Sequence, residues 1–413
     1  MKPKPTPSVS RFGLERSRDK ADKNPHPNGW GFAAAQSSAT RRAALARGTV
    51  EDRSPQSVTG KSLKRTVNGH TFIFMVVETN PVFVYNADIP SRPGDCTFKR
   101  NKTDGILQLK EVHDMRILSL GSLNIDHIYA VPHFIQGAET LSVQGLTQSV
   151  GGKGLNQSVA AARAGAPVFH AGMLGRGGGP LQAFLNQNNV DTSLIRPCEI
   201  QQGHTVIQVD PSGQNCILVY GGSNQQIEKS YIDEVLSHFV PGDCVMLQNE
   251  ISNLHYAVEA AHAKGLHIVL NASPFHDALF SLDFKKLDWL VVNELECAAI
   301  GACSDTWRAY QALRNRFPSL GILLTLGAEG SLCWKDGQQL RQKAFPTQAI
   351  DTTGAGDTFV GYFVGCLAQG FCRADSMRLA SMAAAIAVSR PGAAPSIPQM
   401  GEVRQAFQQT FSK

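Results

Sequence analysis

The stretch AIDTTGAGDTFVGYF, residues 349–363, joins two aspartates, a run of small residues and an apolar segment of helical character. Gly354, Ala355 and Gly356 place successive backbone N–H groups where this helix begins, and unpaired amides at a helix N-terminus bind anions. Asp357 falls in the first turn, where a carboxylate can be a simple cap worth about 0.3–1 kcal/mol. It can also be a general base beside a phosphate pocket. The stretch alone leaves capping and catalysis as equal alternatives.

Strand-like and helix-like segments alternate on both sides of this stretch, from residue 115 onward. RILSLGS, DCVMLQNE, HIVLNASP and DWLVVNE read as buried strands, and helical patterns separate most of them. Such alternation predicts an α/β fold, with a parallel sheet and helices on both faces. TVIQVD and CILVY flank the turn sequence PSGQN and predict a hairpin, which we expect in a small β-sheet at one edge.

Polar residues follow the predicted strands at their carboxyl ends, the edge where parallel sheets bind ligands. They are Asn124, Asp126, Gln248, Asn249, Glu250, Asn271, Asn293, Glu294 and Gly327. Strand termination and helix capping explain each position when it is taken alone. Taken together, these residues predict a cleft at this edge.

The segment GSLNIDH, residues 121–127, places Asn124 and Asp126 on one face if the chain is extended. A paired amide and carboxylate suit vicinal hydroxyls, which both donate and accept hydrogen bonds. An Asx turn is the alternative.

The segment SVGGKGLNQSVAAARAGA, residues 149–166, brings glycines to the start of an alanine-rich helix. Glycines allow a backbone to approach a ligand closely, with Lys153 and Asn156 beside it. A loop that enters a tightly packed helix is the alternative. The segment does not match a P-loop, because Gly154 rather than Ser or Thr follows the lysine.

Two further segments suit a nucleotide and its metal ion. In VVNELE, Asn293 and Glu296 lie on one face if a helix begins there, and their oxygens suit Mg²⁺ held through water. TLGAEG, residues 325–330, combines a strand end with a glycine turn that could lie along a nucleotide. Helix capping alone could explain either segment.

These motifs, with DTTGAGDTF and AVSRPGAAPSIP, follow one another in an order that resembles the ribokinase-like sugar kinases, the PfkB carbohydrate kinase family. The resemblance covers residues 115–413. It implies a three-layer α/β/α sandwich with a mostly parallel central sheet. It also implies a small β-sheet lid, over about residues 121–150 and 203–222, that often forms a homodimer interface.

The resemblance also implies roles for individual residues. Asp357 corresponds to the base that takes the proton of the sugar's primary hydroxyl, and Gly354, Ala355 and Gly356 to the anion hole for the phosphoryl group. Sugar contacts are implied for Asn124, Asp126, Gly152, Lys153, Asn156, Glu250 and Asp357. ATP contacts are implied for Asn293, Thr325, Leu326, Gly327, Ala328, Glu329, Gly330, Gly356 and Ser381. A K⁺ ion is implied at Asp351, Thr353, Ala387, Arg390, Gly392 and Ser396, and Mg²⁺, through water, at Glu296.

The implied reaction is ATP-dependent phosphorylation of a sugar. GSLNIDH with GGKGLN favours D-ribose, which would give D-ribose 5-phosphate, over phosphorylated hexoses, which need a cationic set for their phosphate. Deoxyribose, fructose or a nucleoside stays open as the substrate, and a non-catalytic sugar or nucleotide sensor is the other alternative. Gly177 stands where the family usually has an acidic residue, and we expect a loosened helix start there.

Residues 1–114 carry the excess positive charge, with 19 Lys and Arg against 11 Asp and Glu, whereas the rest has 20 against 23. The excess positive charge therefore lies outside residues 115–413, which argues against a nucleic-acid-binding core. We expect residues 1–66 to be mostly disordered, with a short helix over residues 32–47. Residues 71–85 predict an edge hairpin or an isolated sticky segment. We expect the whole region to be an N-terminal extension, largely disordered, or an upstream start-site artefact, because MRILSLGS at Met115 begins as a family member would.

Nine cysteines without a CxxC pair or zinc spacing indicate free thiols in a reducing cytosol. No run of 18 apolar residues and no secretory signal is present in the sequence. We therefore expect a cytoplasmic location and no membrane partner.

Overall fold

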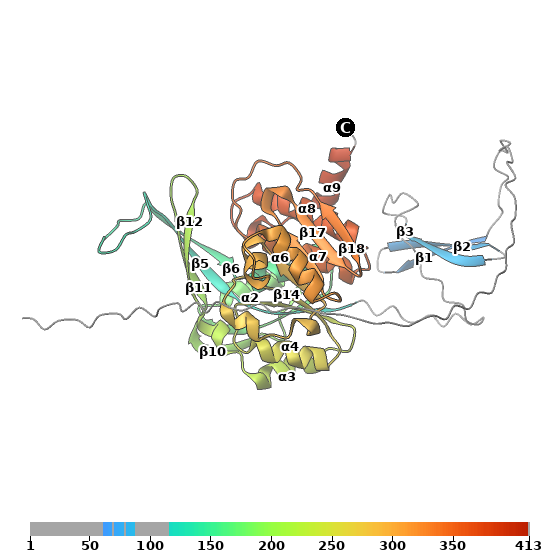
Figure 1. Ribbon diagram of the computed structural model, residues 1–413, viewed down its shortest axis with the longest axis horizontal. Coiled ribbons are helices and arrows are strands. Elements are labelled where there is room, and N and C mark those ends of the chain that lie inside the picture. Colours follow the sequence, from blue (N-terminus) through green and yellow to red (C-terminus); the bar gives the residue numbers. More distant parts are fainter. Residues whose placement is uncertain (1–60, 68–69, 78–79, 87–114, 412–413) are drawn as a thin grey trace, which may run out of the picture. The chain divides into compact units, whose positions relative to one another are not determined.

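The computed structural model describes residues 115–411, together with the backbone of residues 61–67, 70–77 and 80–86. In the N-terminal part, β1 (Lys61–Val67), β2 (His70–Val77) and β3 (Asn80–Asn86) form an antiparallel sheet in that order (Figure 1). The expected hairpin is present, in a sheet of its own rather than at an edge of the main sheet. Residues 61–66, at the end of the segment expected to be mostly disordered, lie in β1. The helix expected over residues 32–47 lies outside the described residues.

A nine-stranded sheet forms the centre of the second part, in the order β18-β17-β16-β15-β14-β13-β4-β7-β9. Neighbouring strands are parallel from β16 to β9, and β17 and β18 add an antiparallel edge. The strands are β4 (Ile117–Leu120), β7 (Val168–Ala171), β9 (Val190–Asp191), β13 (Cys244–Gln248), β14 (His267–Asn271), β15 (Trp289–Val292), β16 (Gly321–Thr325), β17 (Ser331–Lys335) and β18 (Gln338–Gln342). The mostly parallel α/β sheet predicted from the alternation is confirmed.

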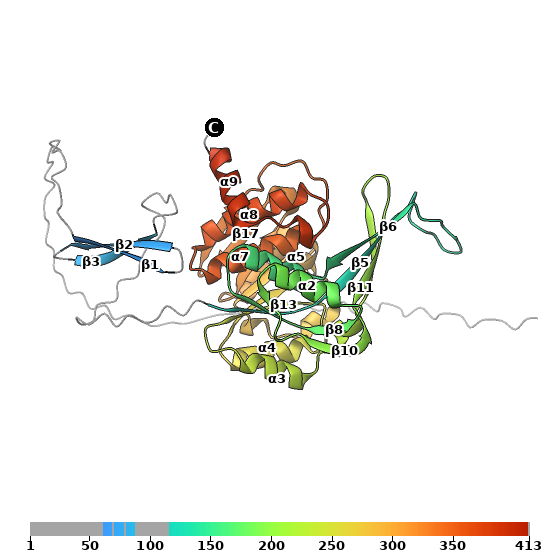
Figure 2. The same ribbon diagram turned by 180° about the vertical axis from the view of Figure 1, so that it is seen from behind.

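Helices cover both faces of this sheet, because successive residues of its buried strands point to opposite sides. Val245 and Leu247 of β13 enter one core, whereas Cys244 and Met246 enter the other. The first core is closed by α3 (Lys229–Ser237), α4 (Leu254–Ala263), α5 (Glu294–Ile300) and α6 (Thr306–Arg316). The second is closed by α1 (Lys153–Arg163), α2 (Gly179–Gln187), α7 (Ala355–Ala368), α8 (Arg373–Val388) and α9 (Met400–Phe411). The three layers are seen from opposite sides in Figures 1 and 2.

A second, four-stranded sheet projects from one side of these layers, at the left in Figure 1. Its order is β12-β11-β5-β6, and its strands are β5 (Asn124–Ala130), β6 (Gly145–Gly151), β11 (His204–Val209) and β12 (Asn215–Tyr220). These strands, called the small sheet below, lie within the two segments expected to form a lid. The hairpin predicted around PSGQN is confirmed as β11 and β12.

Shorter elements connect these layers. β8 (Met173–Arg176) and β10 (Arg196–Gln201) form a parallel pair. Single turns of 3₁₀ helix are η1 (Gly222–Gln226), η2 (Asp277–Ser281), η3 (Phe284–Lys286), η4 (Gly327–Glu329) and η5 (Ala394–Ser396). Gly177 has a φ of 90°, which favours glycine, and α2 forms two residues later without a side-chain cap. Within the described residues, no helix has the length and apolar character needed to cross a membrane.

The close packing of α1 against α7 is what positions the site. A Cβ atom on Gly361 would lie 2.5 Å from the Gln157 carbonyl oxygen and 2.5 Å from the Ala160 Cβ atom. A Cβ atom on Gly365 would lie 3.0 Å from the Ala161 carbonyl oxygen. Side chains at these two positions would push the helices apart, so the glycines let the first turn of α1 meet the first turn of α7.

Candidate active site

Asp357 lies in the first turn of α7 and is only 7% exposed. Its Oδ2 atom accepts a hydrogen bond of 2.9 Å from the Asn156 amide, and its Oδ1 atom accepts one of 2.9 Å from the Gln157 amide. Both donors lie on α1. The carboxylate is therefore held on both oxygens by neutral amide donors. Such a carboxylate keeps lone pairs that can accept a further proton.

The backbone around Gly354 and Gly356 is shaped for an anion. Gly354 is the N-cap of α7 and has a φ of 73°, a conformation that favours glycine. A Cβ atom on Gly356 would meet no atom within 4 Å, so open space adjoins the first amides of the helix. Open amides at a helix N-terminus are a site for phosphate oxygens.

A cavity of about 130 Å³ lies in front of these amides. Its lining brings together residues that were predicted for four different roles: base, anion hole, sugar contact and nucleotide or metal contact. It is lined by Lys153, Asn271, Ser273, Val291, Val292, Asn293, Glu296, Thr325, Gly354, Gly356, Asp357 and Val360. The cleft predicted at the carboxyl ends of the strands is therefore present, since β14, β15 and β16 end at this cavity.

Asn124 and Asp126 lie on one buried face of β5, as the extended reading of GSLNIDH predicts. The Asn224 amide donates a hydrogen bond of 2.7 Å to the Asn124 Oδ1 atom, and the Thr205 hydroxyl donates one of 2.6 Å to the Asp126 Oδ1 atom. Burial raises the pKa of Asp126 to about 6; the Thr205 hydrogen bond opposes this, and the negative charge of Glu250 adds to it. A further hydrogen bond from a hydroxyl group would therefore stabilise the ionised Asp126 carboxylate.

Lys153 and Glu250 form the charged centre between the small sheet and α7. The Glu250 carboxylate accepts hydrogen bonds from the Ser122 hydroxyl and, at 3.2 Å, from the Lys153 backbone N–H. Burial raises the pKa of Glu250 above its usual value, and Lys153 opposes the change. For Lys153, burial favours the neutral form, but the charges of Asp357 and Glu250 outweigh it, and its pKa is raised. A lasting positive charge thus sits beside Asp357.

Asn293 and Glu296 form a capping box at the start of α5. Asn293 Oδ1 accepts a hydrogen bond of 2.9 Å from the Glu296 N–H, and Glu296 Oε2 accepts one of 2.9 Å from the Asn293 N–H. The capping alternative is therefore true of this pair, and both residues also line the cavity. Burial raises the pKa of Glu296 above its usual value. One carboxylate oxygen is held by the cap, and the Ser273 side chain also makes a hydrogen bond to this carboxylate.

The remaining predicted nucleotide contacts lie at the outer side of this cavity or beyond its lining. Thr325 ends β16 and lines the cavity, and the chain then turns through η4. Ser381 is buried and donates a hydrogen bond of 3.4 Å to the Lys343 carbonyl oxygen. The predicted contacts outside the lining are Leu326, Gly327, Ala328, Glu329, Gly330 and Ser381.

The two loops predicted to hold K⁺ meet at Asp351. Its Oδ1 atom accepts a hydrogen bond of 2.9 Å from the Thr353 N–H, and its Oδ2 atom accepts one of 2.8 Å from the Gly392 N–H. Burial opposes ionisation of this carboxyl, but the Thr353 and Gly392 hydrogen bonds prevail and hold its pKa below the usual value. Ala387 lies at the end of α8, Arg390 just after that helix, and Ser396 in η5, on the two sides of Gly392. The part of the chain that the structure describes contains no cluster of three His, Cys, Asp or Glu residues able to hold a metal.

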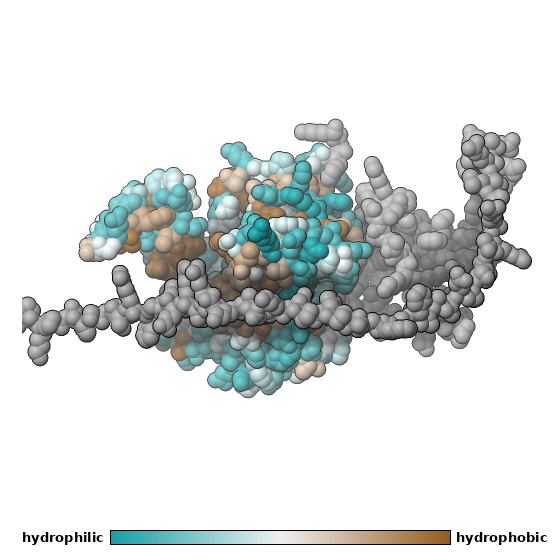
Figure 3. Space-filling model, viewed as in Figure 1, coloured by the Kyte–Doolittle hydropathy of each residue, from teal (hydrophilic) through white to brown (hydrophobic). Residues whose placement is uncertain are grey.

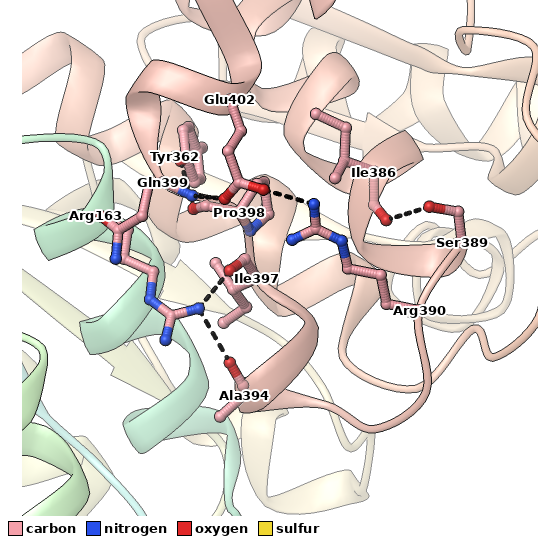
Figure 4. A network of polar contacts seen from close by, with 10 residues as sticks. All are labelled: Arg163, Tyr362, Ile386, Ser389, Arg390, Ala394, Ile397, Pro398, Gln399 and Glu402. Carbon is pink, nitrogen blue, oxygen red and sulfur yellow. Dashed lines mark hydrogen bonds and ion pairs between the residues drawn. The ribbon is translucent and has the colours of Figure 1, made fainter.

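A polar network holds the second of these loops from outside (Figure 4). Arg163, the last residue of α1, donates hydrogen bonds to the carbonyl oxygens of Ile397 and, at 3.5 Å, Ala394. The Tyr362 hydroxyl donates one of 2.7 Å to the Pro398 carbonyl oxygen. Arg390 donates one of 2.5 Å to Glu402 of α9. Helices α1, α7 and α9 therefore all fix the loop that faces Asp351.

Several residues of the site escaped prediction, among them Gln157, Thr205 and Asn224, which contact predicted side chains directly. Gln157 directly follows the predicted Asn156, and adjacency on a short helix was a signal that could have identified it. Thr205 and Asn224 are 79 and 100 residues away from the side chains that they contact. No local pattern marks them, because the pairing of β11 with β5 brings Thr205 to Asp126, and η1, which follows β12, carries Asn224 to Asn124.

Comparison with known proteins matches residues 114–400 to the family described as pfkB family carbohydrate kinase. A ribokinase of Haemophilus influenzae is 35% identical over 296 residues, which span 68% of this chain and 95% of that protein. The crystal structure of a ribokinase from Cryptococcus neoformans in complex with ADP has a TM-score of 0.63 and 32% identity, covering 71% of this chain and 99% of the other. The structure of Arabidopsis thaliana ribokinase complexed with ribose and ATP has a TM-score of 0.61 and 26% identity, covering 71% and 98%.

Proposed function

The chain belongs to the pfkB family of carbohydrate kinases, and on that premise we propose that it transfers the terminal phosphoryl group of ATP to the primary hydroxyl of D-ribose, giving D-ribose 5-phosphate. The names of its relatives, and the ribose and ATP in one of them, support this substrate pair. Residues 115–413 are the proposed kinase domain, which the family match supports, and the small sheet is the proposed lid.

The observation that carries the proposal is Asp357, held at the N-terminus of α7 beside open amides and within one cavity with Lys153 and Glu296. In the proposed reaction Asp357 takes the proton of the primary hydroxyl while that oxygen forms a bond to phosphorus and ADP leaves. The amides after Gly354 and the Lys153 ammonium stabilise charge on the moving phosphoryl group. Asn124, Asp126, Asn156 and Glu250 offer the amide and carboxylate groups that sugar hydroxyls need.

Two ions belong to the proposal. The buried Glu296 carboxylate, anchored on one oxygen, fits a role in orienting water around Mg²⁺, which would neutralise the phosphates of ATP. The Asp351 carboxylate, which joins the two loops through the Thr353 and Gly392 N–H groups, fits K⁺, which would stabilise the anion hole beside it. This chain's residues would supply hydrogen-bonded carboxylates at both places.

The small sheet is also the proposed homodimer interface. All six residues of β12 are exposed, and four of them in succession are large and apolar: Ile217, Leu218, Val219 and Tyr220, at 46%, 64%, 58% and 49% exposure. Figure 3 shows hydrophobic surface over this sheet, at the left of the view. An exposed apolar edge strand favours association with another sheet. A cytoplasmic location is proposed because the nine cysteines of the sequence form no CxxC pair and have no zinc spacing, as is usual for thiols of a reducing compartment.

The test is a coupled assay of ADP release with ribose, deoxyribose, fructose and nucleosides, each with and without K⁺. We expect turnover on ribose and its stimulation by K⁺. Asp357→Asn should lower kcat by about 10²–10⁴ with ATP and sugar binding retained. Turnover on another sugar but not on ribose would overturn the substrate, and full turnover in Asp357→Asn would overturn the base.

A further inference from the structure

The buried glutamines behind Asp357 form a directed chain. Gln157 donates from Nε2 to Asp357 Oδ1 at 2.9 Å, and Gln248 donates from Nε2 to Gln157 Oε1 at 2.8 Å. Both glutamine side chains are fully buried, at 0% exposure. Gln248 is the last residue of β13, two positions before Glu250, so the chain runs from the central sheet through α1 to α7.

The direction of these hydrogen bonds is fixed by chemistry. An ionised carboxylate can only accept, so the Gln157 side chain must turn its NH₂ group toward Asp357 and its oxygen toward Gln248. Gln248 must then present its own NH₂ group. Hydrogen bonds aligned in one direction strengthen one another in a buried setting. The two glutamines therefore form a series of hydrogen bonds that ends in an N–H donor to Asp357 Oδ1.

The cost of this arrangement is visible at its far end. The Gln248 Oε1 atom is buried and lacks a hydrogen-bond partner within the described residues. Gly121 leaves it room, since a Cβ atom there would lie only 2.2 Å from it. A buried amide oxygen without a partner destabilises the fold by about 1–3 kcal/mol. This destabilising group indicates that the hydrogen bond from Gln248 Nε2 to Gln157 has a functional role that offsets the loss of stability.

The role of these hydrogen bonds follows from the charged groups around Asp357. Three carboxylates act on the same centre: Asp126 from β5, Glu250 after β13 and Glu296 from α5. Lys153 of α1 is the cation that opposes them. A hydrogen bond to a carboxylate favours its charged form and fixes its orientation, so a donor among these neighbouring carboxylates acts against their repulsion.

We propose that Gln157, oriented by Gln248, is a positioning residue that fixes the Asp357 carboxylate plane toward the sugar hydroxyl. The inference rests on the proposed role of Asp357 as base. Asn156 holds the other oxygen but also faces the sugar in the proposed scheme, whereas Gln157 and Gln248 are sealed from the cavity. Their effect is therefore expected in turnover and not in substrate binding.

The test is Gln157→Leu, which removes the donor at similar volume. We expect kcat to fall about 10- to 100-fold, the usual worth of a hydrogen bond to a charged group. The acid limb of kcat against pH should move to higher pH, and KM for ATP and for ribose should change by no more than about threefold. Gln248→Leu should move both quantities in the same direction by less, and it carries the test if Gln157→Leu does not fold.

The matched control is Gln369→Leu. Gln369 links the same two helices at their other ends, donating to the carbonyl oxygens of Ala164 at 2.9 Å and Gly365 at 2.8 Å. Its loss should lower thermal stability without moving the pH profile. A glutamine at position 157 that served only packing would behave in the same way, with an unmoved acid limb, and that result would overturn the inference.

Asp357→Asn separates this inference from the function on which it rests. In that background Gln157→Leu should cause little further loss, because the carboxylate that it serves is gone. A large loss of turnover in Asp357→Asn with wild-type turnover in Gln157→Leu would refute the role of Gln157 and support Asp357 as the base. Wild-type turnover in Asp357→Asn would refute both roles.

Discussion

Thr205 of β11 donates a hydrogen bond of 2.6 Å to Asp126 of β5, its direct partner in the parallel register of the small sheet. Both residues are 7% exposed. The small sheet therefore supplies both the proposed sugar carboxylate and the hydroxyl that orients it. Correct recognition of a sugar at this position depends on the pairing of two strands that are distant in sequence.

Thr205→Val should weaken sugar binding. Valine keeps the shape of threonine and removes the donor, so the Asp126 carboxylate loses its orienting partner and becomes easier to protonate. We expect KM for the sugar to rise about tenfold at pH 7, with little change in KM for ATP. Thr147→Val, an exposed position of the same sheet, is the control and should have no effect. Equal sugar KM values in the two variants would contradict the role of Thr205.

Asp126 should make sugar binding sensitive to pH. Burial raises its pKa to about 6, so the carboxylate that accepts hydrogen bonds from hydroxyls is lost as the pH falls through about 6. KM for the sugar should therefore increase between pH 7 and pH 5 in the wild-type protein. In Asp126→Asn the KM should be high and flat over this range. A parallel pH dependence in both proteins would point to another group.

The same shift should appear in the stability of the folded chain. The pKa of Asp126 is raised in the folded state from 3.8 to about 6, so the folded state favours the protonated form. Its contribution to stability is complete below about pH 4 and is lost as the pH rises through about 6. Asp126→Asn should thus be more stable than the wild type at pH 7 and gain less at pH 4, as measured by urea unfolding. An equal gain at both values would contradict the shift.

Arg163→Ala should loosen the loop that faces Asp351. Arg163 holds the carbonyl oxygens of Ile397 and Ala394 from the end of α1, and its loss leaves them without that donor. We expect a loss of about 1–3 kcal/mol in stability and a higher K⁺ concentration for half-maximal turnover. Arg404→Ala, an exposed position on α9, is the control. An unchanged K⁺ response in a less stable protein would confine Arg163 to a structural role.

Leu218→Lys should prevent the proposed association through the small sheet. A lysine in the middle of the apolar strand β12 would place a charge inside the interface, a device that keeps edge strands apart. Analytical ultracentrifugation should show a dimer for the wild type and a monomer for the variant. Val240→Lys, at a residue 45% exposed and outside the small sheet, should remain dimeric. A wild-type monomer would refute the interface.

The sequence alone determined the features that depend on neighbouring residues. The alternation of buried strands and helices predicted the layers, since local periodicity fixes which side of each element is apolar. The glycines before Asp357 predicted an anion site, because a helix N-terminus exposes amides whatever surrounds it. Asn293 and Glu296 predicted a helix start, which is present as a capping box.

Only the tertiary structure decided what these groups can do. Asp357 is held by Asn156 and Gln157, which are 201 and 200 residues away in the chain. The contact exists because Gly361 and Gly365 let α1 approach α7, and hydrogen bonds require that closeness to within a few tenths of an ångström. Asp126 likewise takes its raised pKa from burial and from charges on other elements. The residue types could be read from the chain, but their donors, charges and accessible faces arise only when the helices and the small sheet pack together.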